Sequence, residues 1–149
     1  MQNIGAYGVE VEQFIDYIEY YDLSEKRHKI LNSQDCEFAY RDSVFKNRLA
    51  DQVVITKVNL AIPKIWKGVT HYGELKQLAE PSAPDIFNKV VEVRHSKLPD
   101  PAKIGNAGSF FKNPIVDKAH YHQLQQSWPS IPSYPVDTDK VKIPAAWLI

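Results

Sequence analysis

A serine beside two glycines is the first feature of the sequence that could do chemistry. It lies in the decapeptide Gly105-Asn106-Ala107-Gly108-Ser109-Phe110-Phe111-Lys112-Asn113-Pro114. Glycine tolerates positive φ and close ligand approach, so this turn could hold the Ser109 hydroxyl in one direction. In an extended segment, Phe110 and Phe111 would point to opposite faces, one of them into a core. A solvated surface turn is the alternative, because the segment contains neither a G-x-S-x-G elbow nor a phosphate-binding loop.

Two sets of cations could bind an anion. Between Arg94 and Lys112 the sequence has four fixed cations and one carboxylate, Asp100, which indicates either a local anion site or a solvated loop. Arg41 follows Tyr40, and neighbouring aromatic rings could hold its guanidinium rigid beside a carboxylate. An ordinary surface arginine is the alternative.

His120 and His122 are two residues apart on a predicted helix and face different ways, so no metal site is expected.

Composition restricts the classes of function. The chain has 149 residues, enough for one domain or two small lobes, with 18 Lys and Arg balancing 18 Asp and Glu. A neutral chain has no long-range field for nucleic acid or an anionic membrane, so neither is expected as a partner. No signal peptide or long apolar span is present, and the single cysteine, Cys36, is expected to be a small buried hydrophobe. A cytoplasmic location is therefore predicted.

The elements that must position these residues are strands and helices of an α+β fold. Strands are predicted over residues 9–21, 29–31 and 52–63, with a charged hairpin connection between the first two. In residues 9–21 a helical template also fits, and the aromatic and β-branched content favours a strand. A helix is predicted over residues 82–96, with Pro84 in its first turn and one apolar stripe, made by Ile86, Phe87, Val90 and Val93.

Shorter elements complete the expected organisation. A short helix should begin near Tyr72, Asp42 or Ser43 should cap a helical turn, and Asp117 should cap a helix that ends near Ser127. A hairpin is expected around residues 137–139. Two prolines in residues 98–101 mark the predicted boundary between residues 1–98 and 99–149. Because both ends of the sequence have nothing to pack against, the chain is expected to be a fragment.

Four segments in one order and spacing carry a resemblance to a known family. The chain resembles UDP-N-acetylenolpyruvoylglucosamine reductase (UDP-N-acetylmuramate dehydrogenase) over essentially its whole length. The segments are Asn3-Ile4-Gly5-Ala6-Tyr7-Gly8, Tyr40-Arg41-Asp42-Ser43-Val44-Phe45-Lys46, Thr70-His71-Tyr72-Gly73-Glu74-Leu75, and residues 97–114 with their specific decapeptide.

The resemblance implies an FAD-dependent oxidoreductase of peptidoglycan synthesis, and hence of cell wall biogenesis, cell shape and cell division. NADPH would reduce the flavin, and UDP-N-acetylglucosamine enolpyruvate would then be reduced to UDP-N-acetylmuramate. Residues 1–98 would be part of the FAD-binding region, an antiparallel sheet with flanking helices. Residues 99–149 would begin a smaller α+β substrate-binding domain. The complete protein would be a monomer.

The resemblance also assigns roles to individual residues. Ser109 would be the proton donor, and Arg41 the cation beside the substrate carboxylate. The flavin would meet Ile4, Gly5 and Arg94. The sugar nucleotide would be held by Tyr72, Lys97, Asn113 and Tyr134.

Three readings remain open from the sequence. The chain is part of the reductase, a UDP-sugar-binding module without catalytic activity, or an inert remnant. Relative to the family it lacks an N-terminal flavin lobe and a C-terminal segment with a catalytic glutamate. By itself it is therefore expected to bind FAD poorly and to show no reductase activity.

Overall fold

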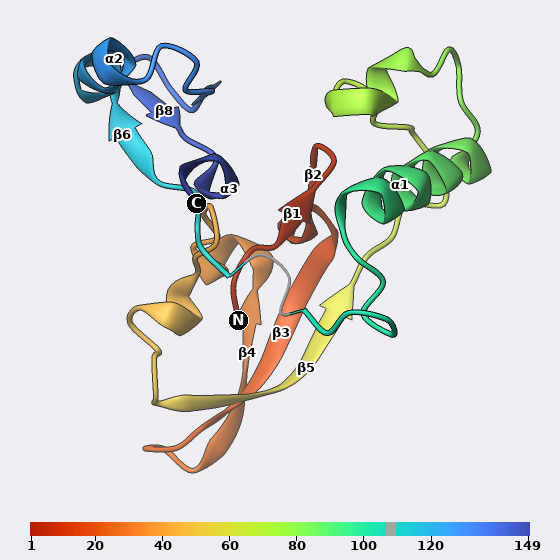
Figure 1. Ribbon diagram of the computed structural model, residues 1–149. Coiled ribbons are helices and arrows are strands. Elements are labelled where there is room, and N and C mark those ends of the chain that lie inside the picture. Colours follow the sequence, from red (N-terminus) through yellow and green to blue (C-terminus); the bar gives the residue numbers. More distant parts are fainter. Residues whose placement is uncertain (107–109) are drawn as a thin grey trace. The chain divides into compact units, whose positions relative to one another are not determined.

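The computed structural model describes residues 1–106 and 110–149 and divides the chain into two compact units, Met1–Leu98 and Pro99–Ile149 (Figure 1). Each unit combines short antiparallel strands with helices, which confirms the α+β prediction. The assignment of the two units to a flavin-binding region and a substrate-binding domain stays a prediction.

The first unit is built on a three-stranded antiparallel sheet. β3 (Ile15–Asp22) is the central strand, between β4 (Arg27–Asn32) and β5 (Val53–Leu60). The β3–β5 pairing shifts register twice, so the strands are bulged there. The strand expected over residues 29–31 is confirmed. The strand expected over residues 52–63 is also present, and its β-branched residues suit a pleated surface, but it ends at Leu60 and not at Pro63.

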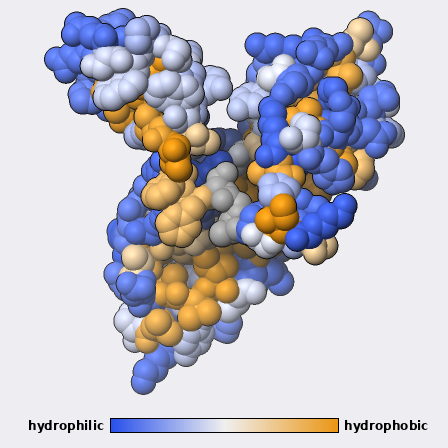
Figure 2. All heavy atoms as spheres, in the orientation of Figure 1, coloured by the Kyte–Doolittle hydropathy of each residue, from blue (hydrophilic) through white to orange (hydrophobic). Residues whose placement is uncertain are grey.

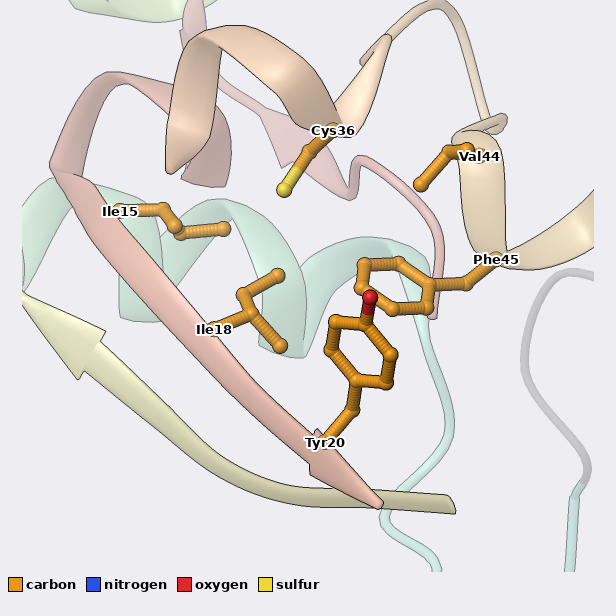
Figure 3. Close-up of a cluster of buried hydrophobic side chains, with 6 residues drawn as sticks. All are labelled: Ile15, Ile18, Tyr20, Cys36, Val44 and Phe45. Carbon is orange, nitrogen blue, oxygen red and sulfur yellow. The ribbon is translucent and has the colours of Figure 1, made fainter. Parts of the chain in front are cut away.

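One face of β3 carries the core of this unit. Ile15, Ile18 and Tyr20 pack against Cys36 and Phe45, together with Val44 (Figure 3). The last three come from two 3₁₀ turns, η2 (Ser33–Cys36) and η3 (Val44–Lys46). The Ser43 hydroxyl accepts a hydrogen bond from the Phe45 amide, so the predicted cap is confirmed.

Cys36 behaves as the sequence predicts. Its side chain is fully buried, and burial, with a smaller effect from nearby Asp35, raises the pKa of the thiol to about 11. A thiol with so high a pKa carries almost no thiolate at neutral pH and is a poor nucleophile. Cys36 therefore serves packing.

The segment before β3 differs from the single strand expected over residues 9–21. β1 (Gly5–Ala6) and β2 (Val9–Glu10) form a small hairpin, and a 3₁₀ turn, η1 (Val11–Phe14), follows. The strand prediction is wrong for this turn and correct from Ile15 onward. The physical reason is a contact with a residue outside the segment, since the Glu12 amide donates to the Asn3 side chain at 3.2 Å instead of joining the sheet.

The predicted long helix is α1 (Ala83–Lys97), which packs against η4 (Gly73–Gln77). Ser82 and Asp85 form a capping box at its start, and Tyr72 is the N-cap residue of η4. The expected apolar stripe is only partly correct, because Val93 is buried whereas Phe87 is 68% exposed. The short η4 covers only part of the stripe.

The second unit has its own sheet and core. β6 (Ile115–Asp117) and β7 (Tyr134–Pro135) flank β8 (Lys140–Lys142), and α2 (Lys118–Ser127) and α3 (Ala145–Leu148) complete it. The expected helix and hairpin are confirmed, although the Asp117 side chain makes no capping bond. The core consists of Tyr121, Ile131, Val141 and Ile143. Within the described ranges, no helix is long and apolar enough to cross a bilayer.

The aromatic pair after the glycine turn is placed differently from the prediction. Phe110 and Phe111 lie outside any strand and are 82% and 62% exposed, so neither enters a core. Their rings contact each other edge to face, with centroids 5.3 Å apart. The expectation that they face opposite sides of a sheet is wrong, since no strand includes them.

The sheet of the first unit leaves one face open. Figure 2 shows hydrophobic surface over this sheet, in the lower part of the view. Ile30 lies opposite Glu19 and Val54 opposite Tyr21, so both alternate away from the buried Ile18 and Tyr20, and both are more than half exposed. An antiparallel sheet with one face on a core and one face open gives this pattern.

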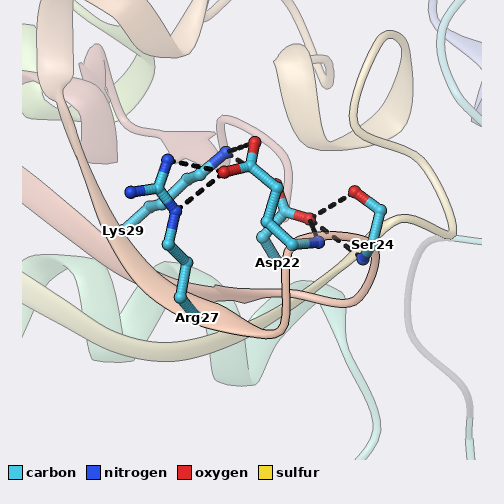
Figure 4. Close-up of polar contacts among 5 residues, drawn as sticks. Asp22, Ser24, Arg27 and Lys29 are labelled. Atoms are coloured by element: carbon cyan, nitrogen blue, oxygen red, sulfur yellow. Dashed lines mark hydrogen bonds and ion pairs between the residues drawn. The ribbon is translucent and has the colours of Figure 1, made fainter.

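The hairpin between β3 and β4 is closed by a buried carboxylate (Figure 4). One oxygen of Asp22 accepts from the Ser24 amide at 3.0 Å, from the Ser24 hydroxyl at 2.7 Å and from the Glu25 amide at 2.9 Å. The other oxygen accepts from Lys29 at 2.9 Å. These bonds, with that to Lys29 the largest cause, hold the pKa of Asp22 far below its ordinary value. Asp22 therefore stabilises the turn through hydrogen bonds to its backbone and side chains.

We expect Asp22→Asn to destabilise the first unit in a pH-dependent way. Because the pKa of Asp22 is lower in the folded state, its contribution to stability is fully present above the ordinary Asp pKa of about 3.9 and is lost as pH falls through the folded value. Thermal unfolding followed by circular dichroism should therefore show the largest loss near pH 7 and a shrinking one below about pH 4. Asp16→Asn, at an exposed position of the same strand, is the control. Equal losses from both substitutions at all pH values would contradict this role.

Candidate functional site

The residues that the sequence singles out are divided between the two units. Ser109 lies outside the described residues, so its prediction remains untested. Asn113 and Tyr134 belong to the second unit. The first unit holds the others, which are Ile4, Gly5, Arg41, Tyr72, Arg94 and Lys97.

The Arg41 guanidinium is held by the backbone of the N-terminal segment. Its Nη1 donates to the Asn3 carbonyl at 3.1 Å, and its Nη2 donates to the Gly5 carbonyl at 2.8 Å. The guanidinium carbon also lies 5.2 Å from the centre of the Tyr40 ring. The structure therefore brings Arg41 and the Ile4-Gly5 segment together, although they are far apart in the sequence.

The Arg41 backbone is itself constrained. It has φ of 56°, a left-handed conformation that is unusual for a residue with a side chain. Its carbonyl accepts from Lys46 Nζ at 3.0 Å, and the same ammonium donates to the Gln2 side chain at 3.1 Å. The neighbouring Ser43 hydroxyl donates to the Met1 carbonyl at 2.6 Å. Contacts on both sides of Arg41 thus fasten it to the start of the chain, and local strain of this kind persists only where the surroundings enforce it.

A second cluster surrounds Lys97 at the end of α1. Its ammonium is hydrogen-bonded to the Glu74 carboxylate, which raises the pKa of Lys97, with Tyr7 and Tyr72 close enough to add smaller effects. The same bond lowers the pKa of Glu74. The Tyr7 and Tyr72 rings meet edge to face at 6.2 Å. The two residues predicted to bind the sugar nucleotide in this unit, Tyr72 and Lys97, therefore share one cluster.

The turn that carries Tyr7 depends on Gly8. This residue has φ of +83°, and an added Cβ would lie 3.1 Å from Val69, 3.2 Å from His71 and 3.3 Å from Tyr72. A side chain at this position would therefore be strained and would push against three residues. Gly8 lets the Tyr7 turn lie directly on the segment that carries Tyr72.

An apolar pocket of about 680 Å³ adjoins this turn. Its volume lies in the range of small-molecule sites, and its lining is mostly apolar. The lining includes Tyr7, Phe14, Ile62, Ile65, Trp66, Leu75, Ile86 and Val90. Sequence reasoning missed Ile65 and Trp66, because their segment has no helical or strand periodicity that would mark a face.

Three predicted residues take no part in these clusters. Arg94 is exposed near the end of α1, its carbonyl accepts from the Leu98 amide, and its side chain has no recorded contact with Ile4 or Gly5 among the described residues. The Asn113 side chain accepts from the Ala145 amide at 2.9 Å. Tyr134 is half exposed and pairs with Lys142 in the second sheet. The structure therefore shows a local role for Asn113 and leaves the binding roles of all three as predictions.

Comparison with known proteins gives one consistent result. No protein-family model matches the chain. All 149 residues align at 57% identity with the UDP-N-acetylenolpyruvoylglucosamine reductase of Pseudoalteromonas atlantica, covering 43% of that protein. The proteins of the same name from Idiomarina loihiensis and Vibrio vulnificus are 51% and 49% identical, and the chain covers 45% and 43% of them. Along its whole length, the chain is therefore homologous to part of the UDP-N-acetylenolpyruvoylglucosamine reductases, and it spans less than half of their length.

Proposed function

We propose that the chain contributes the substrate-carboxylate cation and part of the ligand-binding surface to an FAD- and NADPH-dependent reductase. The reaction would convert UDP-N-acetylglucosamine enolpyruvate into UDP-N-acetylmuramate for peptidoglycan in the cytoplasm. The names of the relatives support this reaction. The observation that carries the proposal is the pair of hydrogen bonds from Arg41 to the Asn3 and Gly5 carbonyls, called the Arg41 clamp below. These bonds join two segments that the family resemblance links to substrate and flavin.

The clamp suits stabilisation of a developing negative charge. Addition of a hydride to the terminal enol carbon leaves charge on the adjacent carbon, shared with the carboxylate. A guanidinium has five N–H donors in a rigid fork, and two of its nitrogens are fixed here by carbonyls. The remaining donors can face a carboxylate without reorganisation, which is the condition for electrostatic stabilisation of a transition state.

The Lys97 cluster suits the sugar nucleotide. Lys97 is 60% exposed, and its partner Glu74 is 37% exposed, so solvent reaches both side chains. An incoming diphosphate could compete with Glu74 for the ammonium, while the Tyr72 ring offers a surface for a sugar or base. The family resemblance also assigns Asn113 and Tyr134 of the second unit to binding of the sugar nucleotide. The Ser109 hydroxyl would deliver the proton to the carbon next to the carboxylate.

The flavin is proposed to bind in the first unit. The pocket beside Tyr7 is apolar and large enough for part of a ring system, and its lining begins at Ala6, next to Gly5, but includes none of Ile4, Gly5 and Arg94. Ile4 and Gly5 would hold the flavin beside Arg41, with Arg94 as a further contact. When bound and reduced by NADPH, the flavin supplies the hydride.

The proposal is tested in a chimera that carries these 149 residues in place of the matching part of the Pseudoalteromonas atlantica reductase. In this chimera we expect Ser109→Ala to leave flavin reduction by NADPH nearly normal, because that step does not use the Ser109 proton. Reoxidation by the enolpyruvyl substrate should slow by about two to four orders of magnitude. Rapid mixing separates the two phases, and Ser130→Ala, an exposed serine of the same unit, is the control. Normal reoxidation would remove Ser109 from the catalytic residues.

Lys97→Ala in the same chimera should act on binding. A diphosphate contact is present in both ground and transition states, so the variant should raise KM for the sugar nucleotide by roughly ten- to a hundredfold with kcat nearly unchanged. Lys76→Ala, which removes an exposed lysine of η4, should change neither constant. A fall in kcat with constant KM would contradict a binding role.

Arg41→Lys should act on the chemical step instead. The lysine keeps the charge but cannot occupy both carbonyls and face a carboxylate with a planar fork. Steady-state kinetics should show kcat reduced by about a hundredfold or more, as for loss of one donor to a developing oxyanion. If KM rises while kcat is retained, Arg41 only binds substrate and the assigned role is wrong.

A further inference from the structure

Asn3 is a fully buried polar residue directly before the predicted flavin segment. Its exposed fraction is 0%, yet each of its polar groups has a partner. Its amide donates to the Asp42 carbonyl at 3.4 Å, and its carbonyl accepts from Arg41. The side-chain oxygen accepts from the Glu12 amide at 3.2 Å, and the side-chain nitrogen donates to Glu10 Oε2 at 2.7 Å. Asparagine, with one acceptor and one donor at its tip, fits this site better than aspartate or leucine.

Glu10 reaches Asn3 by passing over Gly5. A Cβ at Gly5 would lie 2.7 Å from Glu10 Cγ and 3.2 Å from Glu10 Oε1. The two residues are also opposite each other in the β1–β2 hairpin. The absence of a side chain at Gly5 therefore leaves the path along which the Glu10 carboxylate reaches the buried amide.

We propose that Glu10 and Asn3 are positioning residues for Arg41. The Glu10 carboxylate fixes the Asn3 side chain, and Asn3 and Gly5 then present their carbonyls to the guanidinium at a set separation. In this role, Glu10 and Asn3 would act through Arg41 and would not touch the reacting atoms. This inference rests on the proposed function, because it concerns the direction in which Arg41 faces the substrate carboxylate.

Of the two nearby glutamates, only Glu10 contacts Asn3 through its carboxylate. Glu12 is two residues away, but it contributes only its backbone amide to Asn3. Glu10 supplies the charge-assisted bond, which is stronger than a neutral one and has a narrower geometry. Loss of this bond would free the Asn3 side chain and, with it, one of the two carbonyls that orient Arg41. A small displacement of the Arg41 guanidinium would lower the reaction rate, because the stabilisation that it provides depends on its orientation.

The test uses the chimera and a double-mutant cycle. Glu10→Ala should lower kcat by about ten- to a hundredfold, with KM for the sugar nucleotide changed less than kcat. Glu10→Gln keeps an acceptor of the same length and should recover most of the rate. In an Arg41→Lys background, Glu10→Ala should cause little further loss, because both substitutions disturb one interaction. Glu12→Ala keeps the backbone amide and is the matched control.

A merely structural Glu10 would give different results. Its substitution would lower stability, and its effect on kcat would be the same in the wild-type and Arg41→Lys backgrounds. That additivity, or a normal kcat for Glu10→Ala, would overturn the proposal. If Glu10→Ala does not fold, Glu10→Asp serves as the second variant, since its shorter side chain keeps the charge but cannot keep the same contact.

A measurement on the 149-residue chain itself separates this inference from the proposed function. In nitrogen-15 spectra, a guanidinium fixed by two carbonyls should show separate Nη resonances for Arg41 in the wild type. These should merge in Glu10→Ala and stay separate in Glu10→Gln and Glu12→Ala. Failure of the chimera to turn over substrate would refute the proposed function alone. Unchanged Arg41 resonances in Glu10→Ala would refute the positioning role alone.

Discussion

The hydrogen bonds from Arg41 to the Asn3 and Gly5 carbonyls are the constraint on which the candidate site depends. They join the first residues of the chain to a loop about 40 residues later, at 3.1 and 2.8 Å. Neither segment belongs to the three-stranded sheet, so sheet pairing alone would leave both free to move. The contacts of Ser43 with the Met1 carbonyl and of Lys46 with the Gln2 side chain add to the same attachment. A guanidinium held by backbone atoms cannot easily change direction, because the backbone atoms are themselves fixed by other bonds.

The two cationic side chains of the first unit differ in the way they are held, and the difference matches their proposed roles. Arg41 is bound to carbonyls, which carry no net charge and do not cancel its own charge. Lys97 is bound to the Glu74 carboxylate, a partly exposed partner that another anion could replace. A fixed charge can stabilise a transition state, whereas an exchangeable partner favours reversible binding of a diphosphate.

Sequence patterns predict the parts of this fold whose signals are local. β5 follows from its alternation, α1 from Pro84 in its first turn and its apolar stripe, and the turn after Ser43 from its cap. Phe87 shows the limit of local signals. The apolar stripe of α1 can be predicted from the sequence, but the stripe does not reveal that the short η4 leaves Phe87 exposed. The Val11–Phe14 turn shows the same limit. Its sequence fits both a helical and an extended template, and the hydrogen bond from the Glu12 amide to the Asn3 side chain favours the turn. The clamp itself could not be derived from spacing. Only the family resemblance placed Arg41 and Gly5 at one site, and the backbone contacts of Arg41 supply the physical link.

Overall neutrality gives these local arrangements their importance. With 18 positive and 18 negative side chains, the chain has no net field to draw the proposed anionic sugar nucleotide from a distance. Discrimination must then come from contact, through the direction of a few donors and the shape of the surface around them. A cation in such a site is useful only if its orientation survives thermal motion, because a freely rotating guanidinium would spread its charge over many directions. In the proposed arrangement, the burial of Asn3 and the absence of a side chain at Gly5 help to provide that orientation.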